Sequence, residues 1–189
     1  MDLRSRIIAA ASDLFQSTGL QFTMQEVAAA LNISKKTIYT VYSSKEFLLI
    51  DMIDNLFADI HRKKTELAAA PIPIEDRIRS VIVAMPEQYN TFDFRQLGEL
   101  EDKYPAAAQR VRQHLTENWD TTIALLEEGI ASGKIRPVSI PILKRVITAS
   151  IESLLLEENS EGDYTESLKT MIDIIMNGIR RREDEVQHK

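Results

Sequence analysis

The chain has 189 residues, of which 44% are hydrophobic, 28% charged and 6% aromatic, and it contains no cysteine. This composition allows a buried core and argues against disorder, while the lack of cysteine excludes disulfides and thiolate chemistry and fits a reducing cytoplasm. The N-terminus has no signal-peptide pattern, and no apolar run reaches the roughly 18 residues of a membrane span, so we expect a soluble cytoplasmic protein without a membrane partner.

The net charge of −6 is unevenly distributed along the chain. Residues 1–50 carry five basic and four acidic residues, a net of +1, whereas residues 51–189 carry 18 basic and 25 acidic residues, a net of −7. Three of the five N-terminal cations lie between Lys35 and Lys45. Because phosphate binding needs positive charge only where the protein touches DNA, an acidic remainder would confine DNA contact to this end.

The N-terminal part of the chain is predicted to form three helices. Apolar residues at three- and four-residue spacing predict the first, from Leu3 to Phe15, with Gly19 at its C-terminal end. Thr23 opens a T-x-x-E capping box for a short second helix. Asn32 suits a left-handed turn, and Ser34 can cap a short third helix. Two short helices joined by a tight turn are the ingredients of a helix-turn-helix.

The rest of the chain also reads as helix. A capping box at 43–46 opens a long helix that extends to about Leu67, with prolines, glycines and polar stretches separating the later helices. Those helices are expected at about 75–89, 93–102, 105–132, 142–156 and 163–182. No segment alternates long enough to form a strand. The sequence therefore predicts an all-α fold of about nine helices.

Many distinctive positions in the first part of the chain occur together in one known family. They are Arg6–Ala11, Leu14–Phe15, Gly19, Thr23–Met24, Glu26–Ala28, Ile33–Tyr39 and Ser44–Leu49. Together they resemble the signature of the TetR (tetracycline-repressor) family of transcriptional regulators. The resemblance implies a helix-turn-helix DNA-binding domain, here residues 1–46, and a larger helical domain for effector binding and dimerisation, here residues 47–189.

The resemblance also implies which residues face DNA. They are Thr23, Met24, Ser34, Lys35, Lys36, Thr37, Tyr39, Tyr42 and Lys45. The second helix would offer its N-terminal amides to a phosphate, and the start of the third would face bases or backbone. One position departs from the family pattern, because Val41 stands where a tyrosine or histidine is common and cannot donate a hydrogen bond. Tyr42 then either packs inward like the family's phenylalanine or turns its hydroxyl toward DNA.

The larger domain is expected to bind a small apolar or aromatic effector. The candidate contacts are Phe57, His61, Met85, Gln88, Tyr89, Phe92, Phe94, His114 and Trp119. Such a set combines apolar rings with a few polar groups, as ligand pockets do. Aromatic residues at helical spacing are also typical of an ordinary core, so both interpretations stay open.

The last two helices carry broad apolar bands. These bands include Val146, Ile147, Ile151, Leu154, Leu155, Leu168, Met171, Ile172, Ile175 and Ile179. Their breadth favours a second partner surface, as in the four-helix interface of a homodimer that the resemblance implies. Burial within a single chain is the competing interpretation.

Together these features predict a sequence-specific DNA-binding regulator. The specific hypothesis is a repressor that binds a palindromic operator in double-stranded DNA as a homodimer and responds to a ligand. An activator or a DNA-bound scaffold without a small-molecule effector is the alternative, followed by a helical carrier or enzyme. The three histidines lie far apart, and no catalytic or nucleotide-binding motif is present. We therefore expect no enzymatic activity, no metal and no cofactor.

Overall fold

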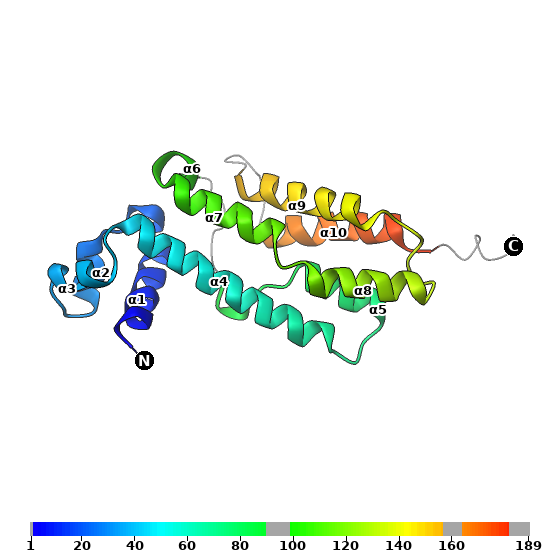
Figure 1. Cartoon of the computed structure of the whole chain (residues 1–189), viewed down its shortest axis with the longest axis horizontal. Coiled ribbons are helices and arrows are strands. Elements are labelled where there is room, and N and C mark those ends of the chain that lie inside the picture. Colours follow the sequence, from blue (N-terminus) through cyan, green and yellow to red (C-terminus); the bar gives the residue numbers. More distant parts are fainter. Residues whose placement is uncertain (1, 90–98, 157–163, 182–189) are drawn as a thin grey trace, which may run out of the picture.

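The structure, a computed structural model, describes residues 2–89, 99–156 and 164–181. Over these residues it is an elongated array of helices, with the N-terminal helices at one end and the C-terminal end of α10 toward the other (Figure 1). The α-helices are α1 (Leu3–Thr18), α2 (Met24–Ala30), α3 (Lys35–Val41), α4 (Lys45–Ala68), α5 (Ile74–Ile82), α6 (Leu100–Lys103), α7 (Pro105–Thr116), α8 (Asp120–Ala131), α9 (Ile140–Leu156) and α10 (Tyr164–Ile179). Two short 3₁₀ helices, η1 (Gly19–Gln21) and η2 (Glu87–Tyr89), complete the set. The predicted all-α class is confirmed, and none of the helices described is long and apolar enough to cross a membrane.

The first four α-helices begin where a side chain caps their free amides. Asp2 accepts a hydrogen bond from the Ser5 amide at the start of α1. Thr23 and Glu26 form the predicted capping box at α2. Ser34 accepts from the Thr37 amide at α3, and Ser44, rather than Ser43, caps α4. Each cap satisfies an amide that the helix itself leaves unpaired, which fixes where the helix starts.

Two predicted helices are interrupted in the structure. The helix expected at 105–132 is divided into α7 and α8 at Asn118, whose φ of 57° lies in the left-handed region that asparagine tolerates. The helix expected at 75–89 ends at Ile82, before η2. Pro86 explains this end, because it lacks an amide donor and disfavours helical backbone at Met85.

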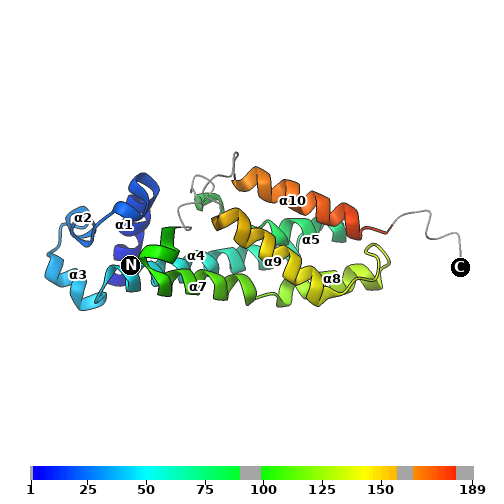
Figure 2. The same cartoon turned by 90° about the horizontal axis from the view of Figure 1, so that it is seen from above.

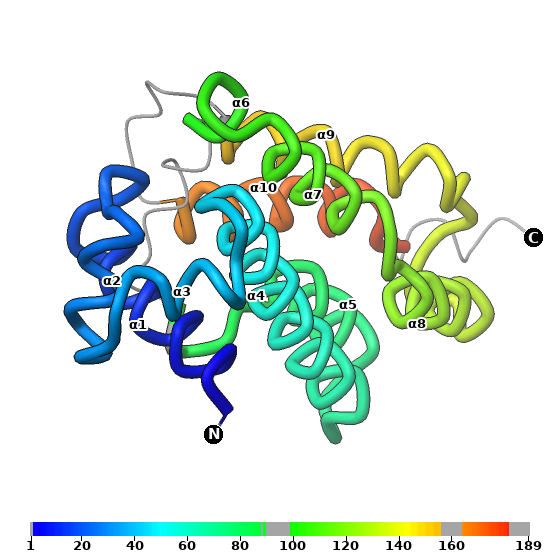
Figure 3. The backbone as a smooth tube through the Cα atoms, turned by 60° about the vertical axis from the view of Figure 1, so that its left-hand side comes forward, coloured from blue at the N-terminus to red at the C-terminus, as the bar shows by residue number. Residues whose placement is uncertain are grey.

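The buried apolar residues form two clusters along the molecule. The first joins α1–α3 to the first half of α4 and to α6 and α7, and contains Ile7, Ile38, Leu48, Leu100 and Ala107. The second is formed mainly by α5, α8, α9 and α10. α4 runs from the N-terminal helices between α5 and α7 (Figure 3), while α9 and α10 lie together on one side (Figure 2). The first cluster crosses the predicted domain boundary at residue 46, and that boundary stays a prediction.

Candidate nucleic-acid interface

The helix-turn-helix consists of α2, a tight turn and α3. The turn places Asn32 at a φ of 54°, in the left-handed region. The Ile33 amide then donates to the Ala28 carbonyl oxygen at 3.0 Å, which closes the turn. Ala28 is only 4% exposed, and its small side chain lets α3 pack closely. Ile38 points inward from α3 and is fully buried, so the opposite face of α3 is turned to solvent.

The solvent-exposed face of α3 carries most of the predicted DNA contacts. Ser34, Lys35 and Lys36 are exposed, and Tyr39 is 44% exposed, an unusual value for an aromatic side chain. The Lys35 ammonium lies 5.8 Å from the centre of the Tyr39 ring. Thr37 is half-buried, and its hydroxyl is 2.8 Å from that of Ser34. The face thus combines two cations, a phenol and hydroxyls, which suits phosphate and base edges.

An open groove of about 630 Å³ runs beside this face. Its walls come from the N-terminal helices, the first residue of α4 and the α6–α7 corner, and include Thr23, Met24, Gln25, Lys35, Tyr39, Lys45, Lys103 and Tyr104. Sequence reasoning missed Gln25, Lys103 and Tyr104. The last two are more than sixty residues from the helix-turn-helix, so no local pattern could have placed them there.

Lys45 has a structural role in addition to the predicted one. Its ammonium donates hydrogen bonds to the carbonyl oxygens of Leu20 at 2.6 Å and Phe22 at 2.5 Å, and so ties the start of α4 to the segment before α2. Burial, and next the positive charge of Lys103, lower the pKa of Lys45. Its contact with phosphate stays a prediction.

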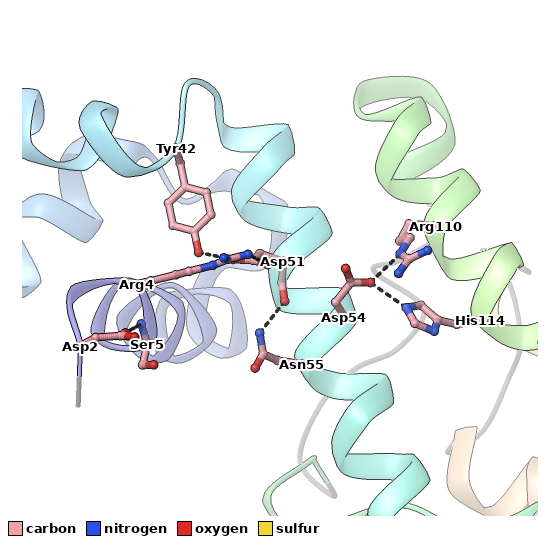
Figure 4. A network of polar contacts seen from close by, with 9 residues as sticks. All are labelled: Asp2, Arg4, Ser5, Tyr42, Asp51, Asp54, Asn55, Arg110 and His114. Carbon is pink, nitrogen blue, oxygen red and sulfur yellow. Dashed lines mark hydrogen bonds and ion pairs between the residues drawn. The ribbon is translucent and has the colours of Figure 1, made fainter. Parts of the chain in front are cut away.

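Two predicted DNA residues turn inward. The Met24 side chain is only 6% exposed, so only its backbone can face DNA. Tyr42 is 5% exposed, and its hydroxyl donates a hydrogen bond to the Asp51 carboxylate, which also accepts from Arg4 (Figure 4). The prediction of a DNA contact from Tyr42 is therefore wrong, because Asp51 holds the hydroxyl in the core. Burial, and next the hydrogen bond to Asp51, raise the pKa of Tyr42.

A second polar cluster joins α4 to α7. Asp54 on α4 accepts from Arg110 Nε at 2.5 Å and lies 2.7 Å from His114 Nε2 (Figure 4). Burial raises the pKa of Asp54, but the hydrogen bonds from Arg110 and His114 outweigh it and leave the pKa below its usual value. The Phe57 ring stacks on His114 with centroids 4.5 Å apart. This pair brings together two of the predicted effector contacts.

The other predicted effector contacts do not form one pocket. Met85 and Tyr89 pack against the first apolar cluster, as Phe57 does, whereas Trp119 is buried in the second and donates its indole N–H to the Leu115 carbonyl oxygen. His61 is exposed to solvent, which contradicts its predicted place in a cavity. Phe92, Phe94 and the side chain of Gln88 lie outside the described residues.

A small cavity lies between α1, α4, η2 and α6. Its lining is Ile8, Ser12, Phe15, Leu49, Met52, Ile53, Asn55, Leu56, Tyr89 and Leu100. Of these, only Tyr89 belongs to the predicted effector set. The free volume is about 50 Å³, far below the 300–1,000 Å³ that is typical of ligand pockets. A larger effector can enter here only if α1 and α4 move apart.

The predicted dimer surface is largely buried within the chain. Ile147, Leu155, Leu168, Ile172 and Ile179 are at most 5% exposed, so for these residues the intrachain interpretation is correct. The partly buried members are Ile151, Leu154, Met171 and Ile175. Val146 is 46% exposed, and Ile142, on the same apolar band of α9, is 57% exposed. Ile174, which sequence reasoning missed, is 69% exposed.

Comparison with known proteins finds similarity to one family of bacterial regulators. Residues 7–52 match the model of the bacterial regulatory proteins of the tetR family. The chain is 25% identical to YvaF, an uncharacterized HTH-type transcriptional regulator of Bacillus subtilis, over 95% of this chain and 96% of that protein. A TetR/AcrR-family regulator of Thermobifida fusca has the same fold, with a TM-score of 0.70 and 22% identity over 96% of this chain and 100% of that chain. FadR of Bacillus subtilis, solved with stearoyl-CoA, gives a TM-score of 0.67 and 18% identity over 93% of this chain and 98% of that chain. Over residues 7–52 the protein thus matches the bacterial regulatory proteins of the tetR family, and over nearly its whole length it is similar to an HTH-type transcriptional regulator and has the fold of TetR-family regulators.

Proposed function

We propose that this protein is a ligand-responsive repressor that binds a palindromic operator as a homodimer. The observation that carries the proposal is the exposed, basic face of α3, on a helix-turn-helix whose apolar side is buried in the first cluster. In this mechanism α3 enters the major groove, and Lys35, Lys36 and the Tyr39 hydroxyl bind phosphates or base edges. Ser34 and Thr37 face the DNA at the start of the helix.

The dimer surface that we favour is the outer face of α9 and α10. Ile142 and Val146 are four residues apart on α9 and therefore lie on one side of it, and Ile174 is the most exposed apolar residue of α10. Large apolar side chains exposed in this way gain free energy when a partner covers them. A two-fold dimer would present two copies of α3 to half-sites about 34–36 Å apart on B-DNA.

The effector that we propose is a small apolar or aromatic molecule. The cavity between α1 and α4 is lined mostly by apolar side chains, and the FadR neighbour was solved with stearoyl-CoA, which supports a ligand with an apolar part. Entry of such a molecule would force α4 away from α1 and change the spacing of the two α3 helices. Repression is relieved only if the effector binds this spread state more tightly than the DNA-bound state.

Selection of bound sequences from a random DNA pool tests the DNA-binding part. We expect enrichment of an inverted repeat, and we expect Lys35→Gln to weaken binding to it without changing the melting temperature. Recovery of no preferred sequence would contradict a sequence-specific regulator and favour a carrier. A reporter gene under the selected operator then separates a repressor from an activator by the sign of the change in expression.

Sedimentation tests the dimer. Val146→Glu places a charge on the proposed interface, and because Val146 is exposed in one chain, the monomer should stay folded. We expect the wild type to sediment as a dimer, and the variant to sediment as a monomer and to lose operator binding, since one half-site alone binds weakly. Arg145→Gln, at an exposed neighbouring position of α9, makes the net charge more negative by the same single unit and serves as the control. A Val146→Glu variant that still dimerises would place the interface elsewhere.

A further inference from the structure

We propose that Lys103, on α6, binds a DNA phosphate, so that the effector-side region contributes directly to the DNA contact. The inference rests on the proposed DNA-binding face of α3, and it adds a residue from a different part of the chain. It concerns the groove beside that face, whose walls come from both regions.

Three lysines from three helices line this one groove. Lys35 comes from α3, Lys45 from the first residue of α4, and Lys103 from the last residue of α6. Lys103 is close enough to Lys45 for its positive charge to lower the pKa of Lys45, so the two ammonium groups repel each other. A phosphate placed in the groove would relieve this repulsion and gain an attraction to each cation. The phenol rings of Tyr39 and Tyr104 complete the walls.

The position of Lys103 is fixed by contacts with the start of α4. The Ala106 amide, at the start of α7, donates to Glu46 Oε1 at 2.9 Å. The Lys45 ammonium lies 5.3 Å from the centre of the Tyr104 ring, within the range of a cation–π contact. α6 accordingly lies beside the N-terminal end of α4 in both Figure 1 and Figure 3. Lys103 is therefore held next to the DNA-binding helices.

Lys103 forms an ion pair with Glu99, one turn earlier, with Nζ and Oε2 2.6 Å apart. Both side chains are 46% exposed, so water and salt weaken the pair, and a DNA phosphate can compete for the ammonium. Glu99 would then act as a brake on DNA binding. An effector that pulled the α6–α7 corner away from α4 would remove one phosphate contact directly.

The salt dependence of operator binding tests the proposal, with the selected operator as the probe. Each phosphate contact contributes about 0.9 to the slope of log K against log salt, so Lys103→Gln should reduce the slope by about 1.8 in a dimer. Lys134→Gln removes the same charge from an exposed residue of the α8–α9 connection, at the far end from α3 (Figure 1), and should leave the slope unchanged. Glu99→Gln should strengthen binding in the wild-type background and have little effect in Lys103→Gln.

The results separate this inference from the proposed function. If Lys35→Gln lowers the slope but Lys103→Gln does not, α3 binds DNA and the contact from α6 is overturned. An equal decrease in Lys103→Gln and Lys134→Gln would also overturn it, because only overall charge would then matter. If neither Lys35→Gln nor Lys103→Gln changes the slope, the proposed DNA-binding face itself is wrong.

Discussion

Two carboxylates on α4, three residues apart, bind partners from different parts of the chain. Asp51 faces the N-terminal helices and accepts from Arg4 and Tyr42, while Asp54 faces α7 and accepts from Arg110 and His114 (Figure 4). Because both carboxylates lie within one turn of α4, that turn is bonded both to the N-terminal helices and to α7. If α7 moved, we would expect this turn of α4 to transmit the movement to the N-terminal helices.

The polar clusters around Asp51 and Asp54 differ in how far the carboxylate is exposed to solvent. The Asp51 side chain is 13% exposed, whereas that of Asp54 is 35% exposed. His114 Nδ1 is buried and has no hydrogen-bond partner among the described residues, so within this part of the chain the Asp54 cluster retains an unsatisfied polar atom. An unsatisfied buried group costs about 1–3 kcal/mol. Asp51 is the more buried of the two carboxylates, and we therefore expect its loss to destabilise the fold more than the loss of Asp54.

The largest expected difference is in the free energy of unfolding when each of the two carboxylates is removed in turn. Asp51→Ala leaves the buried Tyr42 hydroxyl without an acceptor and removes both Arg4 hydrogen bonds, and should lower the free energy of unfolding by about 3 kcal/mol. Asp54→Ala should cost about 1 kcal/mol, because more water reaches the groups left behind. Urea unfolding measures both, and equal losses would contradict the contrast between the two sides.

A smaller difference is expected between two tyrosines three residues apart. Tyr42→Phe removes a buried hydrogen bond to a carboxylate and should lower the free energy of unfolding by about 1 kcal/mol, with operator affinity changed little at temperatures where the protein is folded. Tyr39→Phe should do the reverse, with unchanged stability and operator binding weakened about tenfold, which is 1.4 kcal/mol. If Tyr42→Phe lost as much operator affinity as Tyr39→Phe, the result would indicate that the Tyr42 hydroxyl faces DNA after all.

The smallest difference is expected in acid. The hydrogen bond from Arg4, the largest influence, and that from Tyr42 lower the pKa of Asp51. A carboxyl whose folded pKa lies below its unfolded pKa contributes stability that is complete above the unfolded pKa, near 3.9, and is lost as the pH falls through the folded pKa. The wild type should therefore lose more stability between pH 5 and pH 3 than Asp51→Asn does, as measured by unfolding in urea at each pH. If the free energy of unfolding falls equally with pH in the wild type and in Asp51→Asn, Asp51 does not titrate in this way.

The helix-turn-helix was predictable because its determinants are local. Thr23, Asn32 and Ser34 act within three or four residues along the chain, and the structure confirms each cap and turn. The orientation of Tyr42 depends instead on Asp51, nine residues later, which is itself fixed by Arg4. Periodicity identified α9 as amphipathic but could not tell which apolar side faces the chain, so Ile147 and Val146 were grouped together although one is buried and the other exposed. The break at Asn118 was missed because asparagine is also tolerated within helices.

The buried cluster that crosses residue 46 limits how this regulator can be recombined with others. A hybrid that took only residues 1–46 would leave behind Leu48, Leu49, Ile53 and Leu56, the α4 side chains that complete the core beneath α1–α3. In the hybrid, the core of α1–α3 would then pack against side chains of the other protein instead of the native α4. A transplant that retains the native DNA-binding unit has to carry α4 at least through Leu56, together with side chains on α6 and α7 that match it.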